Sequence, residues 1–184
     1  MLRIASEADA AALLSIYGRY IDTSVTFEYT LPATEAFRAR IRDILAEYPY
    51  LVWEEGGRIL GYAYAHRFRE RAAYRWGAEL SVYLDPDARG RGLGRTLYEA
   101  LIRLLILQGV KTVYGCITLP NDASVGLHEA MGFTRAGVFR SAGWKGGRWH
   151  DIVWYERVLD PGDTAAPFLP FPTIKDRIER EGFL

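Results

Sequence analysis

The stretch from Leu80 to Leu107 constrains the fold of this chain more than any other segment. Residues 80–84 are apolar at every second position, as in a strand that is buried on one face. Asp-Pro-Asp at 85–87 ends that strand. The glycine-rich run 89–95 follows, and 93–107 then places its leucines on one helical face. The segment therefore predicts a strand, a glycine-rich turn and an amphipathic helix.

The turn itself predicts an anion-binding site. Glycines between a strand and a helix leave several backbone N–H groups free at the positive end of the helix dipole, where phosphate is the usual occupant. The dinucleotide-binding fingerprint needs a glycine at the position of Arg95, and the phosphate loop of nucleotide triphosphatases needs a Gly-Lys-Ser/Thr sequence, so both fail here. The pattern that fits is Arg-x-x-Gly-x-Gly, carried by Arg89, Gly92 and Gly94.

Composition limits the class of protein. With 184 residues, 49% of them hydrophobic, the chain can bury one full core. Lys+Arg and Asp+Glu balance at 23 each, which argues against nucleic acid or a membrane surface as a partner. The single cysteine, Cys116, excludes an intrachain disulfide, suits a reducing compartment and is expected to be buried in its strand. Because neither a signal peptide nor a membrane-length apolar run is visible, we expect a soluble, cytoplasmic protein.

The order of elements predicts the fold class. The expected strands are 2–5, 51–53, 59–65, 74–84, 112–118, 133–140 and 149–158. The expected helices begin near 6, 34, 93 and 122, and 23–29 is expected to be a loop near a pocket. This order predicts an α/β (α+β) fold, with a mixed, mostly antiparallel central sheet and helices on both faces. We expect one domain over 1–160, followed by a proline-rich, extended tail over 161–184 that packs on the domain or on a dimer partner.

A second motif makes a family resemblance specific. Residues 121–133 read Asn-x-x-Ser-x-x-Leu-His-x-x-x-Gly-Phe, downstream of the glycine-rich turn and its helix. With both motifs in this order, the chain resembles the GNAT acyl-coenzyme A-dependent N-acetyltransferases. Segments 73–83, 119–122 and 146–151 are similar to the phosphinothricin and methionine-sulfoximine acetyltransferase branch. The resemblance implies the GNAT fold, acetyl-coenzyme A (acetyl-CoA) as co-substrate, and a homodimer.

Glu79 is the candidate general base. An amine attacks a thioester only as the free base, and a carboxylate beside the pocket can accept the proton. Strand alternation places Glu79 on the same face as Ser81 and Tyr83, and partial burial there should raise its pKa. The resemblance also implies a general base at this position.

The resemblance assigns the coenzyme contacts. It implies that the backbone N–H near Val82 meets the thioester carbonyl, and that strand groups freed by a splay pair with the coenzyme arm. It implies that His128, where many GNAT enzymes have a tyrosine, protonates the leaving thiolate. Asn121 caps its helix and, with Ser124, can also contact the arm. The expected coenzyme-binding residues are Val82, Tyr83, Leu84, Arg89, Gly90, Arg91, Gly92, Leu93, Gly94, Arg95, Asn121 and Ser124.

The acceptor side is predicted from a cationic, aromatic loop and from the 23–29 segment. The resemblance implies that Arg71 and Tyr74 line the acceptor pocket and that Phe27 closes it. Glu28 stands where the herbicide-detoxifying enzymes typically carry an arginine, which weakens the case for a diacid-like acceptor such as phosphinothricin. Amino-acid analogues with a neutral polar tail, such as methionine sulfoximine or sulfone, stay open, and so does a more basic amine. Isolated histidines without cysteine partners give no metal-ligand spacing, so we expect no metal.

These features lead us to expect an N-acetyltransferase that moves acetyl from acetyl-CoA to the primary amine of a small amino acid or analogue. We expect direct attack, since no nucleophile for an acetyl-enzyme is evident. Two alternatives stay open. One is acetylation of a protein N-terminus or a lysine, and the other is a non-catalytic acyl-CoA-binding module in which Glu79 and His128 are expendable.

Overall fold

The structure, a computed structural model, describes residues 1–182. Its strands are β1 (Leu2–Ile4), β2 (Tyr50–Glu55), β3 (Arg58–Arg67), β4 (Gly77–Leu84), β5 (Thr112–Thr118), β6 (Thr134–Lys145) and β7 (Arg148–Val158). Its helices are α1 (Ala10–Gly18), α2 (Thr34–Leu45), α3 (Leu93–Leu107), α4 (Asp122–Ala130) and α5 (Phe171–Glu181). Within the described chain, the strands form one seven-stranded sheet in the order β1-β2-β3-β4-β5-β7-β6. The α/β fold with a mixed, mostly antiparallel sheet is as the sequence predicts.

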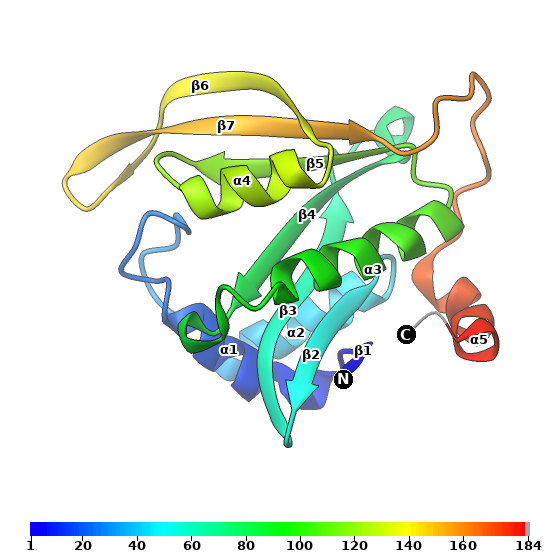
Figure 1. The fold of residues 1–184 in the computed structure, drawn as a ribbon, viewed down its shortest axis with the longest axis horizontal. Helices are drawn as coiled ribbons and strands as arrows, with labels where there is room; N and C mark the ends of the chain where they lie inside the picture. Colours follow the sequence, from blue (N-terminus) through cyan, green and yellow to red (C-terminus); the bar gives the residue numbers. More distant parts are fainter. Residues whose placement is uncertain (183–184) are drawn as a thin grey trace.

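The sheet is covered on both faces (Figure 1). Helices α1 and α2 lie on one face, where Leu13 and Ile41 pack with Tyr62 of the sheet. Helix α3 lies on the other face, where Leu97 and Leu101 join a second apolar core. A leucine-rich face on α3 and alternation along the strands therefore produce two cores, one on each side of the sheet.

The predicted helix cap and hairpin turn are present, but β4 begins later in the chain than the sequence predicts. The Ser6 backbone N–H donates to the Asp9 carboxylate at 2.7 Å, forming the predicted capping box ahead of α1. The β2–β3 hairpin turns at Gly56 and Gly57, which both have positive φ angles. The central strand was expected to begin at Tyr74, but residues 72–74 form a short 3₁₀ turn and β4 begins at Gly77.

The C-terminal segment differs from the expected extended tail. Residues 159–170 have no helix or strand, but 171–181 form α5. Three apolar side chains of α5, Phe171, Ile174 and Ile178, are buried in the α3 core. Their spacing of three and four was a helical signal that the neighbouring prolines obscured. The last two residues of the predicted tail, 183 and 184, lie outside the described residues.

Strands β4 and β5 separate part-way along their length. They are parallel neighbours and pair at Gly77–Thr112, Ala78–Val113 and Glu79–Tyr114. Both strands continue for several residues beyond that last pair without hydrogen-bonding to each other. The result is a fork in the centre of the sheet, as the resemblance implied. Among residues 1–182, no helix is long and apolar enough to cross a membrane.

Candidate active site

The glycine-rich turn folds as an anion-binding loop. Gly90 and Gly92 have φ angles of 74° and 78°, a conformation that other residues rarely adopt. Gly92 is also the N-cap of α3, and no side chain caps the helix there. The first N–H groups of α3 are therefore left for an acceptor from outside the chain.

The arginines of this loop differ in their partners. Arg91 is held by the Glu55 carboxylate, with its Nη2 at 2.9 and 2.8 Å from the two carboxylate oxygens. Arg95 pairs with Glu99 at 2.8 Å, one helical turn away. Arg89 lies over the Tyr20 ring, with 5.3 Å between its Cζ and the ring centroid. No carboxylate of the described chain pairs with Arg89, so its charge is available to an anion.

A cavity of about 390 Å³ lies beside this turn, and we call it the loop cavity. It is lined by Tyr20, Val25, Val82, Leu84, Arg89, Gly90, Gly92, Leu93, Gly94, Arg95, Asn121, Ala123, Ser124 and Leu127. All the predicted coenzyme residues except Tyr83 and Arg91 therefore line one cavity. Arg91 instead hydrogen-bonds to Glu55, and no local pattern in the sequence predicts this contact.

A second, smaller cavity of about 60 Å³ lies at the β4–β5 fork, and we call it the fork cavity. It is lined by Val25, Leu80, Ser81, Val82, Tyr83, Tyr98, Cys116, Ile117, Thr118, Asn121, Ser124 and His128. Four residues line both cavities: Val25, Val82, Asn121 and Ser124. The two cavities therefore adjoin, and together they lead from the glycine-rich turn to the open strand edges.

Glu79 stands at the apex of the fork, as the last residue of β4 that pairs with β5. Its Oε1 lies 4.0 Å from His66 Nε2 on the neighbouring strand, and its side chain is 22% exposed. Burial raises the pKa of Glu79, while the nearby His66 and Arg69 act in the opposite direction. A raised pKa makes this carboxylate a better proton acceptor than an exposed one.

His128 of α4 is almost fully buried, with 2% exposure. Its Nδ1 lies 2.8 Å from the carbonyl oxygen of Ser124, so Nδ1 carries the proton and donates it to that oxygen. Its Nε2 is buried and has no hydrogen-bond partner in the described chain. Burial lowers the pKa of His128, with the Ser124 hydrogen bond as a smaller opposing effect.

Two features of the local chain hold His128 in place. Asn121 Oδ1 accepts from the Ser124 N–H at 3.2 Å, so it caps α4 as predicted. Gly115 is the first residue of β5 beyond the last pair with β4, and a Cβ there would lie 2.3 Å from His128 Nε2. The imidazole therefore occupies space that only glycine leaves open, directly under the fork.

Comparisons with known proteins give the family. A sequence model of the acetyltransferase (GNAT) domain matches residues 2–154. The chain belongs to this GNAT family. A phosphinothricin N-acetyltransferase of Alcaligenes faecalis is 43% identical over 169 residues, covering 90% of this chain and 86% of the relative. An L-methionine sulfoximine/L-methionine sulfone acetyltransferase of Pseudomonas aeruginosa is 35% identical, covering 89% and 97%.

The fold is similar to that of solved acetyltransferases. A GNAT superfamily phosphinothricin acetyltransferase from Sinorhizobium meliloti, solved in complex with acetyl-CoA, matches with a TM-score of 0.87 and 35% identity. The match covers 93% of this chain and 96% of that one. The chain is thus an acetyltransferase of the GNAT family, and the resemblance to the phosphinothricin and methionine-sulfoximine branch is confirmed.

The predicted acceptor residues of this GNAT acetyltransferase come from two separate segments. Phe27 lies against Gly143, where a Cβ would be 2.3 Å from its ring, and Glu28 pairs with Arg40 of α2 at 2.6 Å. Arg71 and Tyr74 lie in the β3–β4 connection and are exposed. None of the four predicted residues lines the loop cavity or the fork cavity.

Hydrogen bonds from Lys145 hold the loop between α1 and α2 against the β6–β7 hairpin. The Nζ of Lys145 is buried and donates to the carbonyl oxygens of Thr26 and Glu28, at 2.6 and 2.8 Å. The Tyr29 hydroxyl donates to the carbonyl oxygen of Trp144 at the same hairpin. The loop that carries Phe27 is therefore held against the end of the sheet. The sequence showed the loop but gave no sign of this long-range contact.

Cys116 is not the buried side chain that the sequence predicted. It lies on β5 beyond the last residue paired with β4, so it has lost a neighbouring strand, and the residue is exposed and lines the fork cavity. Partial burial of its sulfur and the negative charge of Glu79 raise the pKa of the thiol to about 12. A thiol that stays protonated is a poor nucleophile. Within the described chain, no His, Cys, Asp or Glu side chains gather into a metal-binding group.

A larger cavity of about 460 Å³ lies between α1 and the β2–β3 hairpin, away from the fork. Its charged lining residues are already paired. Arg3 binds Asp9 and Glu54 at 2.8 and 2.7 Å, and Arg58 binds Asp85. Since these charges satisfy one another, we assign no function to this cavity.

Proposed function

We propose that this acetyltransferase transfers the acetyl group of acetyl-CoA to the primary amine of a small amino acid or a close analogue, by direct attack. One observation carries the proposal. Glu79 lies at the point where β4 and β5 separate, and the cavity at that fork adjoins the cavity of the glycine-rich turn. The glycine-rich turn and the fork are thus joined by adjoining cavities, and Glu79 stands at the apex of that fork, although its side chain lines neither cavity.

The residues present fit acetyl-CoA. Free N–H groups at the start of α3, together with Arg89, would hold the diphosphate. The unpaired edge of β4 from Val82 to Leu84 leaves backbone groups that would pair with the amide arm, near Asn121 and Ser124. The coenzyme supplies an activated acetyl thioester, and the fork is where the chain leaves room for it.

Glu79 would then accept the proton of the amine. At pH 7 an amine of pKa about 10.4 is neutral in only about one molecule in 10³ to 10⁴, a handicap of ~4–5 kcal/mol. A carboxylate whose pKa is raised by burial removes part of this handicap, directly or through a water. The backbone N–H near Val82, on the unpaired edge, is the proposed donor to the thioester carbonyl.

For His128 the proposed role is to protonate the leaving thiolate. Its Nδ1 proton is held by the Ser124 carbonyl oxygen, and its Nε2 is unprotonated in the neutral ring. In this proposal His128 therefore acts only after a proton reaches Nε2. The raised pKa of the Cys116 thiol supports direct attack, because an acetyl-cysteine intermediate would need a thiolate.

For the acceptor we propose a zwitterionic amino acid with a neutral polar side chain, of the methionine sulfoximine or sulfone type. Relatives at 35–43% identity are named for phosphinothricin and for methionine sulfoximine or sulfone. Glu28 places a carboxylate on the proposed acceptor side, and its pairing with Arg40 makes that corner neutral instead of cationic. The loop around Phe27 is hydrogen-bonded to the β6–β7 hairpin, which favours a small acceptor. A protein substrate would need an open groove instead.

We also propose a cytoplasmic homodimer. The closing hairpin exposes Phe139, Trp144 and Trp149 at 56%, 46% and 59%, a surface that suits a contact between copies. We also propose one domain over 1–160 on which the segment that begins at residue 161 packs through α5, and limited proteolysis tests this division. Light scattering after gel filtration tests the dimer.

The acceptor assignment is tested by a thiol-release assay. The purified chain would be given acetyl-CoA with amino acids, their sulfoximine and sulfone analogues, phosphinothricin, polyamines and peptides. We expect release of coenzyme A thiol above background with the amino-acid analogues. Turnover with peptides or polyamines alone would contradict the proposed acceptor class.

A further inference from the structure

The deep end of the fork cavity holds His128, which the mechanism above uses, and Tyr98, which it does not. Val82, Asn121 and Ser124 also line the loop cavity and so mark the junction. Tyr98 and His128 line the fork cavity alone and so lie beyond that junction. We propose that the hydroxyl of Tyr98 donates a hydrogen bond to the coenzyme sulfur as the thiolate leaves. This inference rests on the proposed function and adds a residue to it.

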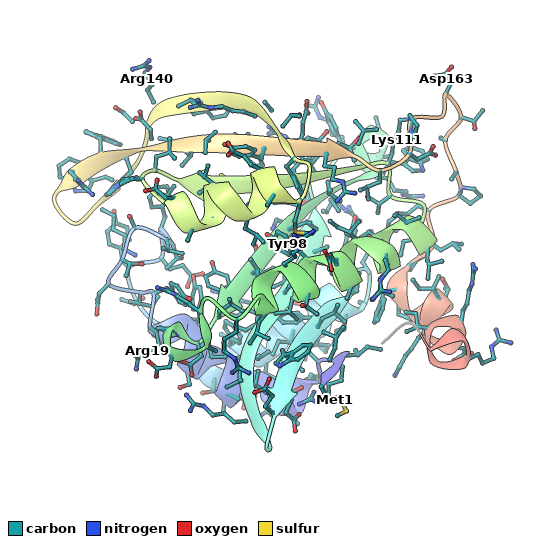
Figure 2. All side chains as sticks on the ribbon, in the orientation of Figure 1. Met1, Arg19, Tyr98, Lys111, Arg140 and Asp163 are labelled. Carbon is teal, nitrogen blue, oxygen red and sulfur yellow. The ribbon has the colours of Figure 1, made fainter. Side chains whose placement is uncertain are left out.

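Tyr98 is well placed for this contact. It projects from α3 on the side that faces α4 (Figure 2), and its ring meets the His128 ring edge-on, with centroids 5.4 Å apart at 85°. The residue is 1% exposed, so its hydroxyl lies within the protein. No other described residue hydrogen-bonds to that hydroxyl. A buried phenol without a partner, facing a cavity, is a donor that a bound ligand can use.

His128 cannot be the donor in its neutral form. Its only N–H, at Nδ1, is already donated to the Ser124 carbonyl oxygen at 2.8 Å. Its Nε2 is a buried lone pair without a partner, and it lies against Gly115 at the fork. This nitrogen can accept a hydrogen bond from the coenzyme arm but has none to give. Tyr98 and His128 therefore offer one donor and one acceptor at the same end of the cavity.

Four other polar side chains that line the cavity are less suited. The Asn121 side chain caps α4, and Ser124 stands at the junction with the loop cavity, short of the deep end. Tyr83 packs on the opposite face of the sheet, where its ring contacts Tyr17 at 5.2 Å. The thiol of Cys116 is a weak donor.

The step balances without a proton leaving Tyr98. The amine nitrogen forms the C–N bond, the C–S bond breaks with its electron pair on sulfur, and Glu79 takes the proton of the amine. Burial raises the pKa of Tyr98, and the charges of Tyr64 and Glu79 add to the effect. A phenol less acidic than a thiol keeps its proton, so Tyr98 stabilises the thiolate by a hydrogen bond until the sulfur is protonated from His128, once a proton has reached Nε2 of that ring.

The test measures the thiol pKa of bound coenzyme A, from the ultraviolet absorbance of the thiolate across pH. Tyr98→Phe removes a donor to the charged sulfur, so it should raise that thiol pKa by about one unit and lower kcat about tenfold. Each of these changes corresponds to a free-energy difference of ~1.4 kcal/mol. Coenzyme A affinity at neutral pH, measured by calorimetry, should stay within about threefold, because the bound thiol is then protonated. Tyr62→Phe is the matched control: this tyrosine is also fully buried, its hydroxyl has no partner in the described chain, and it packs in the α1–α2 core.

The outcomes separate this inference from the proposed function. If the wild-type protein binds no coenzyme A, the proposed function fails and Tyr98 fails with it. If the wild type binds and turns over, but Tyr98→Phe has the same bound-thiol pKa, only the Tyr98 assignment is overturned. Thermal unfolding monitors folding of each variant. If Tyr98→Phe does not fold, the wild-type protein still gives a test. The inference requires the thiol pKa of coenzyme A bound to the wild type to be lower than that of free coenzyme A. An equal or higher pKa overturns the inference.

Discussion

Glu79 and Tyr114 form the last residue pair between β4 and β5. Before this pair the two strands run side by side, and beyond it they part without further hydrogen bonds. The backbone of Glu79 is therefore held by strand pairing at the point where the fork begins. This position gives a rigidly held side chain at the fork, and general-base catalysis requires such a fixed geometry.

Replacing Arg89 by alanine should weaken acetyl-CoA binding about five- to tenfold, or ~1–1.4 kcal/mol, because an unpaired guanidinium near the turn is lost. Arg91→Ala should have a smaller effect, since Arg91 is bound to Glu55. Calorimetric titration of acetyl-CoA into both variants at one salt concentration makes the comparison. A larger loss for Arg91→Ala would show that the wrong arginine has been assigned.

Gly115→Ala should destabilise the fold by ~1–3 kcal/mol, because the added methyl group would lie 2.3 Å from His128 Nε2. The displaced ring should also lower turnover. Gly137→Ala on β6 is the matched control, since a Cβ there meets nothing within 4 Å. Chemical denaturation of the two variants measures the difference, and equal stabilities would mean that the imidazole is not confined by Gly115.

His128 should make the protein less stable as the pH falls. Burial lowers its pKa in the folded state below the ordinary value of 6.5. Between those two values the unfolded chain binds the extra proton, so the free energy of unfolding decreases as pH falls through that window. Glu79, with its raised pKa, contributes with the opposite sign, but it does so in wild type and variant alike.

The measurement is the free energy of unfolding of wild type and His128→Gln at several values between about pH 7.5 and about pH 5. We expect the wild-type stability to fall more steeply toward acid than that of the variant. Parallel curves would contradict a lowered pKa of His128.

Glu28→Gln should shift acceptor preference toward anionic side chains. The substitution removes a carboxylate from the proposed acceptor side and frees Arg40, so the ratio of kcat/KM for phosphinothricin to that for methionine sulfone should rise about two- to fivefold, ~0.4–1 kcal/mol. Glu35→Gln is a control on α2, the helix that carries Arg40, because Glu35 pairs with Arg38 at 3.5 Å on the surface. An unchanged ratio in Glu28→Gln would remove Glu28 from the specificity determinants.

Local patterns in the sequence were enough for the fold and for the local structure of the glycine-rich turn and the α4 cap. Residues 80–107 place a strand, a turn and a helix by period and by glycine, and the structure has β4, the turn and α3 there. Asn121 predicted the cap of α4, and the structure has that hydrogen bond. These features depend on neighbours within a few residues, so they are readable without the fold.

Features that depend on distant segments were not readable. The exposure of Cys116 follows from the loss of β4 as a neighbouring strand. Arg91 hydrogen-bonds to Glu55, which lies 36 residues earlier in the chain. Tyr98 sits on an apolar helix face, and only the placement of α4 shows that the residue lines a cavity. The predicted acceptor residues come from two loops whose relative position no local pattern specifies.

The most direct test of the account is the turnover of Glu79→Gln at neutral pH, measured beside its affinity for acetyl-CoA. The substitution keeps the size of the side chain but removes the proton acceptor at the fork. We predict that kcat falls at least about tenfold, ~1.4 kcal/mol, while the dissociation constant of acetyl-CoA changes by less than about threefold. Wild-type turnover in this variant would contradict the claim that Glu79 accepts the proton of the amine.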